Sequence, residues 1–309
     1  MTRAAEVVAG DVRGVAKALS AVERGGPEAE RLLESLHGRL GSARTVGITG
    51  APGVGKSTLV QALGLALLGS GARVAVLAVD PTSPFSGGAV LGDRVRMPEF
   101  LAGGGFVRSM ATRGALGGLA VAASDAVDVL DAAGFDWVLV ETVGVGQDEV
   151  DVAGEVETVV LVTVAGMGDD VQTAKAGVME IADVFVVNKA DRPGADLQVT
   201  AIEGALSLAP ASAWRPPVVQ TAATSGEGTA ELVDAIRGHQ RFLDGPGLRA
   251  EARRRRARRR MERLVVALVQ QRIRGDLRAV RAVEMASSGE LDPYTAARRV
   301  VDGICGEER

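Results

Sequence analysis

The chain has few of the residues that build disulfides, transition-metal sites or stacked aromatic surfaces. Its 309 residues include one cysteine, two histidines and only 3% aromatic residues. A single cysteine excludes a disulfide within the chain and fits a reducing compartment, so we expect a cytoplasmic protein. A zinc or nickel site made of Cys and His would have almost no ligands to draw on.

Long apolar runs and a strong charge of one sign are also missing. Asp or Arg interrupts every apolar run before it reaches the roughly 20 residues of a membrane helix, and we expect no signal peptide. The formal net charge of −4 gives no general attraction to nucleic acid or to an anionic membrane. We therefore expect neither of them as a partner.

What the chain does contain is a series of short Val, Leu and Ile runs that alternate with segments of helical length. Such runs are typical of a parallel sheet that helices cover on both faces, and this predicts an α/β fold. Ligands of such sheets bind beyond the carboxyl ends of the strands. The runs occupy residues 44–50, 73–80, 106–110, 136–142, 158–165, 183–189 and 217–221.

Both ends of the chain show apolar residues at helical spacing. We expect an N-terminal helical extension over residues 1–43, a central nucleotide-binding domain over 44–248 and C-terminal helices over 249–309. Seven arginines lie between residues 253 and 260, and an apolar stripe follows them. Nothing obvious covers this stripe within one subunit, so we expect a homodimer. The stripe consists of Met261, Leu264, Val265, Leu268 and Val269.

A phosphate-binding motif follows the first apolar run. Residues 50–57, "GAPGVGKS", match G-x-x-x-x-G-K-[ST] between a strand and a helix. The glycines let backbone N–H groups approach phosphate oxygens, and the helix adds its positive end. Lys56 is predicted to reach the outer phosphates, and the Ser57 hydroxyl to bind Mg²⁺. The predicted phosphate-binding residues are Gly50, Ala51, Pro52, Gly53, Val54, Gly55, Lys56, Ser57 and Thr58.

The tetrapeptide "NKAD", residues 188–191, indicates that the base is guanine. Asp191 can accept hydrogen bonds from the ring N–H and the exocyclic amine of guanine, a pair of donors that adenine lacks. We expect Asn188 to contact the other edge and Lys189 to cover the ring face. We expect a backbone N–H of Ala222 or Ala223 to reach the guanine oxygen, and a plain helix-entry loop is the open alternative.

Three acids near strand ends are candidate ligands of Mg²⁺, which prefers oxygen and often keeps several waters. Asp80 ends the second run, Glu141 ends the fourth, and Asp93 lies in the long loop between the second and third runs. Together with Ser57 they form the predicted metal site, with direct and water-mediated contacts both open. Asp93 is equally compatible with a solvated loop acid.

The stretch "ETVGVGQDE", residues 141–149, lacks the glutamine that orients the attacking water in small G proteins. Val145 fills that position, and Gln147 lies two residues further on as a remaining candidate. A valine side chain cannot position water, so we expect slow hydrolysis unless another group arrives. A slow rate suits a timer or a gate better than a metabolic enzyme.

Taken together, several stretches resemble one family, the methylmalonyl-CoA mutase-associated GTPases of the MeaB/ArgK type. Members of that family are G-protein chaperones of adenosylcobalamin-dependent acyl-CoA mutases. The likeness covers nearly the whole chain. It rests on "GITGAPGVGKSTL", "VLAVDPTSPFSGGAVLGDRVRM", "RGALGGLA", "VETVGVGQDE", "GMGDDVQTAKAG", "VVNKAD" and "LDPYTAA".

The resemblance implies a P-loop NTPase with two switches, at residues 80–115 and 141–149, and with a C-terminal dimerisation arm. It implies that the mobile loop 169–175 signals to the mutase, with Asp169 and Lys175 beside Lys56, Glu141 and Gln147 in catalysis. It also implies GTP or GDP and Mg²⁺ as bound groups and no cobalamin site of its own.

Three other functions fit parts of the sequence less well. A GTPase that inserts nickel would need Cys and His ligands that are scarce here. An ATP-dependent kinase of a transport system conflicts with "NKAD". A nucleic-acid-binding protein could use "RRRRARRR", but no aromatic residues accompany the arginines, and a basic helix face is more often solvated or paired with acids.

Overall fold

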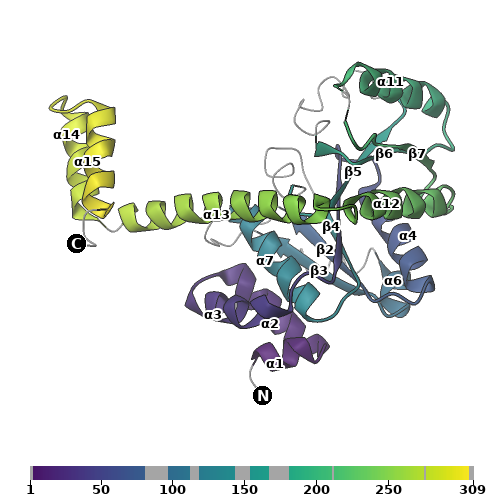
Figure 1. Ribbon diagram of the computed structural model, residues 1–309, viewed down its shortest axis with the longest axis horizontal. Helices are drawn as coiled ribbons and strands as arrows, with labels where there is room; N and C mark the ends of the chain where they lie inside the picture. Colours follow the sequence, from purple (N-terminus) through teal and green to yellow (C-terminus); the bar gives the residue numbers. More distant parts are fainter. Residues whose placement is uncertain are drawn as a thin grey trace. The chain divides into compact units, whose positions relative to one another are not determined.

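The parallel sheet predicted from the apolar runs is present. The computed structural model describes residues 3–80, 97–111, 118–142, 154–166, 181–210, 212–274 and 276–305. Within these ranges seven strands, all paired in parallel, lie in the order β3-β2-β4-β1-β5-β6-β7 (Figure 1). The strands are β1 (Arg44–Thr49), β2 (Val74–Asp80), β3 (Phe106–Ala111), β4 (Trp137–Thr142), β5 (Thr158–Val164), β6 (Val184–Asn188) and β7 (Val218–Thr221).

Helices precede the sheet, connect its strands and follow it. The helices are α1 (Arg3–Val8), α2 (Val12–Arg24), α3 (Pro27–Leu36), η1 (a 3₁₀ helix, His37–Arg39), α4 (Lys56–Gly69), α6 (Pro98–Ala102), α7 (Gly118–Ala132), α11 (Ala195–Leu208), α12 (Thr229–Leu243), α13 (Leu248–Arg274), α14 (Leu277–Ser287) and α15 (Pro293–Cys305). None of the described helices is both long and apolar enough to cross a membrane.

Helices cover both faces of the sheet because strand side chains alternate between its two sides. In β2, for example, Leu77 belongs to the apolar cluster under α1, α2, α3 and α7. Its neighbour Val76 belongs to the cluster under α4, α6 and α12. A smaller cluster joins α11 to β5 and β6. The doubly covered α/β sheet with N-terminal and C-terminal helices is therefore confirmed.

A buried polar network connects α12 to the amino-terminal ends of β5 and β6. His239 Nδ1 lies 3.0 Å from Thr158 Oγ1, and His239 Nε2 lies 3.3 Å from Asp183 Oδ1. Burial raises the pKa of Asp183 to about 7, although the Val159 N–H bond to its carboxylate counteracts this. Burial, together with the Arg249 guanidinium, lowers the pKa of His239 to about 4. Both side chains thus favour their neutral forms.

Arginines at the start of α13 bind the domain that carries the sheet. Arg249 Nη1 donates to Glu157 Oε1 at 2.7 Å, and Arg253 Nη2 donates to the Gly41 carbonyl at 2.7 Å. Arg256 Nη2 lies 3.7 Å from the same Glu157 oxygen. Spacings of four and three residues place these arginines on one helix face. Part of the basic run is therefore committed to intramolecular contacts.

The chain forms two compact units, Met1–Arg256 and Ala257–Arg309, and the division falls inside α13. In the second unit α14 and α15 pack against each other through a small apolar cluster that includes Ala282 and Val300. The predicted apolar stripe stands largely in solvent within one chain, since Met261 is 58% exposed and Leu268 is 51% exposed.

Candidate nucleotide-binding site

The predicted phosphate loop runs from the carboxyl end of β1 to the first residue of α4. Two of its glycines are required by packing as well as by backbone shape. Gly50 has φ 145°, and a Cβ there would lie 2.2 Å from the Val162 carbonyl oxygen. Gly55 has φ 95°, and a Cβ there would lie 2.5 Å from Asn188 Nδ2. Larger residues would therefore push the loop away from the neighbouring strands.

Lys56, the first residue of α4, is buried beneath this loop. Its Nζ donates to the carbonyl oxygens of Gly50 at 2.6 Å and Ala51 at 3.1 Å. These bonds hold a positive charge at the centre of the loop, next to the helix N-terminus. The ammonium thus bonds to the loop itself, and its contact with the outer phosphates stays a prediction.

Two of the predicted metal ligands meet at the end of β4. Ser57 Oγ donates to Glu141 Oε1 at 2.5 Å, and Glu141 is only 3% exposed. The register places Glu141 between Ile48 of β1 and Ala78 of β2, so the sheet itself holds this acid beside the phosphate loop. A hydroxyl and a carboxylate fit the oxygen ligands that Mg²⁺ prefers.

The other predicted metal and catalytic residues are only partly covered by the described ranges. Asp80 is the last residue of β2, a neighbour of β4, but its side chain lies outside what the structure describes. Outside the described residues altogether lie Asp93, Gln147, Asp169 and Lys175.

Asn188, at the end of β6, connects the phosphate loop to the loop after β7. Its Nδ2 donates to the Val54 carbonyl at 2.8 Å. Its Oδ1 accepts from Thr221 Oγ1 at 3.0 Å and from the Ala223 N–H at 3.2 Å. A side-chain amide has two donors and two acceptor sites, so these three bonds leave one N–H for a ligand. Sequence reasoning predicted only the contact with the base.

The two charged residues of the motif, Lys189 and Asp191, differ in their contacts. Lys189 is the one described non-glycine residue with positive φ, at 57°, and its Nζ donates to the Gly53 carbonyl at 2.7 Å. Its stem therefore lies against the phosphate loop. Asp191 is exposed, so its carboxylate is available to a ligand.

The backbone N–H groups predicted to reach the guanine oxygen make bonds within the protein. The Ala222 N–H donates to the Glu227 carbonyl at 3.0 Å, and the Ala223 N–H donates to Asn188 Oδ1. Either group must exchange its present bond before it can bind the base.

Thr221 contacts the candidate site and was not predicted from the sequence. It ends β7, is almost fully buried and orients the Asn188 amide through its hydroxyl. The only signal in the sequence is a threonine at a strand end, which is too common to single out.

The family model and the sequence relatives both indicate a GTPase. The chain matches the family model described as "Methylmalonyl Co-A mutase-associated GTPase MeaB" over residues 15–278. It is 47% identical over 303 residues to a "Putative GTPase" of Pyrococcus horikoshii, covering 96% of each chain. It is 46% identical over 262 residues to a "Probable GTPase" of Mycobacterium tuberculosis, covering 82% of this chain and 78% of that one. A solved "LAO/AO transport system kinase" shares the fold with a TM-score of 0.74 and 27% identity, over 98% of this chain and 96% of that one.

Proposed function

The chain belongs to the family of methylmalonyl-CoA mutase-associated GTPases, and we propose that its hydrolysis of GTP serves an adenosylcobalamin-dependent acyl-CoA mutase. The family match and the relatives named as GTPases establish the activity class. The family description, which names the mutase, supports the partner. In this proposal the bound nucleotide gates cofactor loading and protection of methylmalonyl-CoA mutase or a close relative.

The observation that carries the proposal is the set of bonds around Asn188. One side chain bonds both to Val54 in the phosphate loop and to Ala223 in the loop after β7. A guanine bound at Asp191 would lie beside the remaining Asn188 N–H, so base and phosphates would be held by one connected unit. Such a unit suits a switch, because a change at the phosphates is transmitted to its neighbours.

The chemistry at the phosphates follows from Lys56, Ser57 and Glu141. In the proposed GTP-bound state Lys56 exchanges its loop carbonyls for phosphate oxygens, to which its positive charge binds more strongly. Ser57 and Glu141 would hold Mg²⁺, with Asp80 as a further ligand at the neighbouring strand end. When bound, the metal neutralises charge on the phosphate oxygens.

We propose an activating partner because the sequence position that carries the water-orienting glutamine in small G proteins holds a different residue here. Val145 stands where small G proteins have glutamine, so the rate without a partner should be low. We propose that the mutase raises the rate by ordering residues 169–175, which bring Asp169 or Lys175 toward the γ-phosphate. Gln147 is the alternative water-positioning group.

The test measures GTP turnover with and without the cognate mutase, together with cofactor transfer in GTP, GDP and a non-hydrolysable analogue. The proposal predicts that the mutase stimulates turnover and that transfer depends on the nucleotide. Gln172→Ala, a change in the signalling loop, should reduce the stimulation with little effect on the basal rate. If the mutase does not change the rate of GTP turnover and the nucleotide does not change cofactor transfer, the chaperone role is wrong. The protein would then be a GTPase with another function.

A homodimer through residues 249–309 is the second part of the proposal. It is supported by the exposure of Met261, Val265 and Leu268. Within one chain these residues are 58%, 51% and 51% exposed. A contiguous apolar stripe of this kind is typical of a subunit interface. The C-terminal segment would therefore work as the dimerisation arm.

A further inference from the structure

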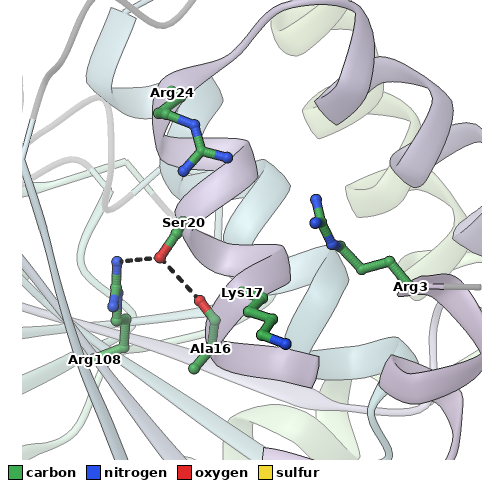
Figure 2. Close-up of a pocket in the computed structure, with 6 residues that line it drawn as sticks. All are labelled: Arg3, Ala16, Lys17, Ser20, Arg24 and Arg108. Carbon is green, nitrogen blue, oxygen red and sulfur yellow. Dashed lines mark hydrogen bonds between the residues drawn. The ribbon is translucent and has the colours of Figure 1, made fainter. Parts of the chain in front are cut away.

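A cavity of about 260 Å³ lies at the edge of the sheet, between α1, α2 and β3. Its lining comes from three elements, and four of its six side chains are cationic (Figure 2). β3 is an edge strand of the sheet. Two strands, β2 and β4, lie between it and β1, which leads into the phosphate loop. The cavity is therefore distinct from the nucleotide site. The lining residues are Arg3, Ala16, Lys17, Ser20, Arg24 and Arg108.

Arg108 occupies an unusual position on β3. It stands between Phe106 and Met110, which point to the same face of the sheet and are buried in the apolar core there. A charged side chain on such a face is costly unless it is paired. Arg108 Nη2 donates to Glu23 Oε2 and to Ser20 Oγ, both at 3.0 Å. The other terminal nitrogen makes no hydrogen bond with the described part of the chain.

The α2 side of the cavity presents Lys17, Ser20 and Arg24 at spacings of three and four residues, which place them on one helix face. Figure 2 shows Arg108 approaching Ser20 from β3, and Arg3 coming from α1. The Lys17 ammonium makes no ion pair with any described residue. Glu28 contacts both Arg3 and Arg24, the latter at 3.6 Å.

Among the described residues, positive charge is in excess around this cavity, although the formal net charge of the chain is −4. Four cationic side chains line it, and two carboxylates, Glu23 and Glu28, are paired with them. The excess of two positive charges among these described side chains matches a dianion. Guanidinium groups and an ammonium match the oxygens of a tetrahedral phosphate. The Ser20 hydroxyl already donates to the Ala16 carbonyl at 3.0 Å, so the cationic groups are the donors that the cavity offers.

We propose that this cavity binds the dianionic phosphate group of a small molecule, either free phosphate or a phosphate monoester. Its volume is below the roughly 300–1,000 Å³ of sites that enclose a whole drug-sized ligand, so the phosphate itself is the recognised group. No aromatic side chain lines the cavity, which disfavours a stacked nucleic-acid base. This inference does not depend on the mutase partner.

The experiment uses the full chain saturated with GDP and Mg²⁺, so that the phosphate loop is occupied. Inorganic phosphate and glycerol 3-phosphate are titrated by calorimetry at constant ionic strength. We expect saturable binding below about 10 mM, and we expect Lys17→Met and Arg24→Gln each to weaken it about tenfold. Both side chains are exposed, so neither change should alter the urea unfolding midpoint or the GDP affinity.

The matched control is Arg31→Gln, which removes one positive charge from an exposed arginine of α3 outside the cavity. It should leave the affinity for phosphate unchanged. Tighter binding of glycerol 3-phosphate would identify a monoester as the ligand, and equal binding would identify free phosphate. The proposal is overturned if neither probe binds, if Arg31→Gln weakens binding as much as Lys17→Met, or if citrate binds more tightly and phosphate does not displace it.

Discussion

The side-chain amide of Asn188 donates a 2.8 Å hydrogen bond to the backbone carbonyl of Val54, across 134 residues of sequence. This bond joins the residue predicted to read guanine to the loop predicted to hold the phosphates. The same amide also orients the loop after β7 through Thr221 and Ala223. Asn188 therefore has a structural role that is independent of any bound nucleotide.

From this role we predict that Asn188→Ala destabilises the nucleotide-free protein. The change leaves the buried partners of the amide without hydrogen bonds, at a cost of about 1–3 kcal/mol for each unsatisfied group. Urea unfolding without nucleotide measures the loss. Asp191→Ala is the matched control, because Asp191 is exposed and its removal should leave the stability near that of the parent. Equal stability of Asn188→Ala and the parent would contradict the structural role.

Asp191 should determine the choice of base. Asp191→Asn replaces an acceptor-only carboxylate by an amide, which can donate to the oxygen that xanthine carries in place of the guanine amine. We expect weaker GDP binding by roughly 1.5–3 kcal/mol per lost charge-assisted bond, together with a gain for xanthosine diphosphate. Competition binding with both nucleotides checks the switch. Equal affinity of the unmodified protein for ATP and GTP would rule out a guanine-specific base site.

Glu141 should matter for turnover more than for nucleotide affinity. Glu141→Ala removes the carboxylate that accepts from Ser57 at 2.5 Å and that is predicted to hold Mg²⁺. We expect a clear loss of GTP turnover and a small change in GDP affinity, measured by phosphate release and by calorimetry. Glu203→Ala is the control, since it removes an exposed carboxylate from α11, outside the predicted site. Undiminished turnover in Glu141→Ala would show that this acid is structural only.

The Asp183–His239 pair predicts pH dependences of opposite sign for two variants. Between about pH 4 and pH 6.5 the folded pair carries one proton on Asp183, and the unfolded chain carries one on His239. The two states bind the same number of protons, so the pair adds no pH dependence in that range. In Asp183→Asn the unfolded state alone binds a proton, so stability relative to the parent should fall as the pH is lowered toward 4.

In His239→Asn the folded state alone binds the extra proton, on an Asp183 whose pKa is raised to about 7. Its stability relative to the parent should therefore fall as the pH rises toward 7. Urea unfolding at several pH values between these limits separates the two slopes. Slopes of the same sign for the two variants would show that the protons are not placed in this way.

Truncation should separate dimerisation from anchoring of α13. A chain that ends at Arg256 keeps the bonds of Arg249 and Arg253 to the sheet domain and should be a monomer that binds GDP. A chain that ends at Leu248 also loses the Arg249 bond to the buried Glu157 and should be less stable by about 1–3 kcal/mol. Light scattering measures the first effect and urea unfolding the second. A full chain that is monomeric at micromolar concentration would contradict the dimer.

The amino-acid sequence by itself determined the parallel sheet, the phosphate motif and the base motif. These features depend on short stretches: apolar runs set the strands, and "GAPGVGKS" and "NKAD" carry their chemistry within a few residues at strand ends. Only the tertiary structure decided which side chains work together. The bonds Ser57–Glu141 and Arg108–Ser20 join residues 84 and 88 positions apart, and the cationic cavity draws on three separate elements. The order of the strands brings these distant residues together, and no local pattern of residues specifies that order.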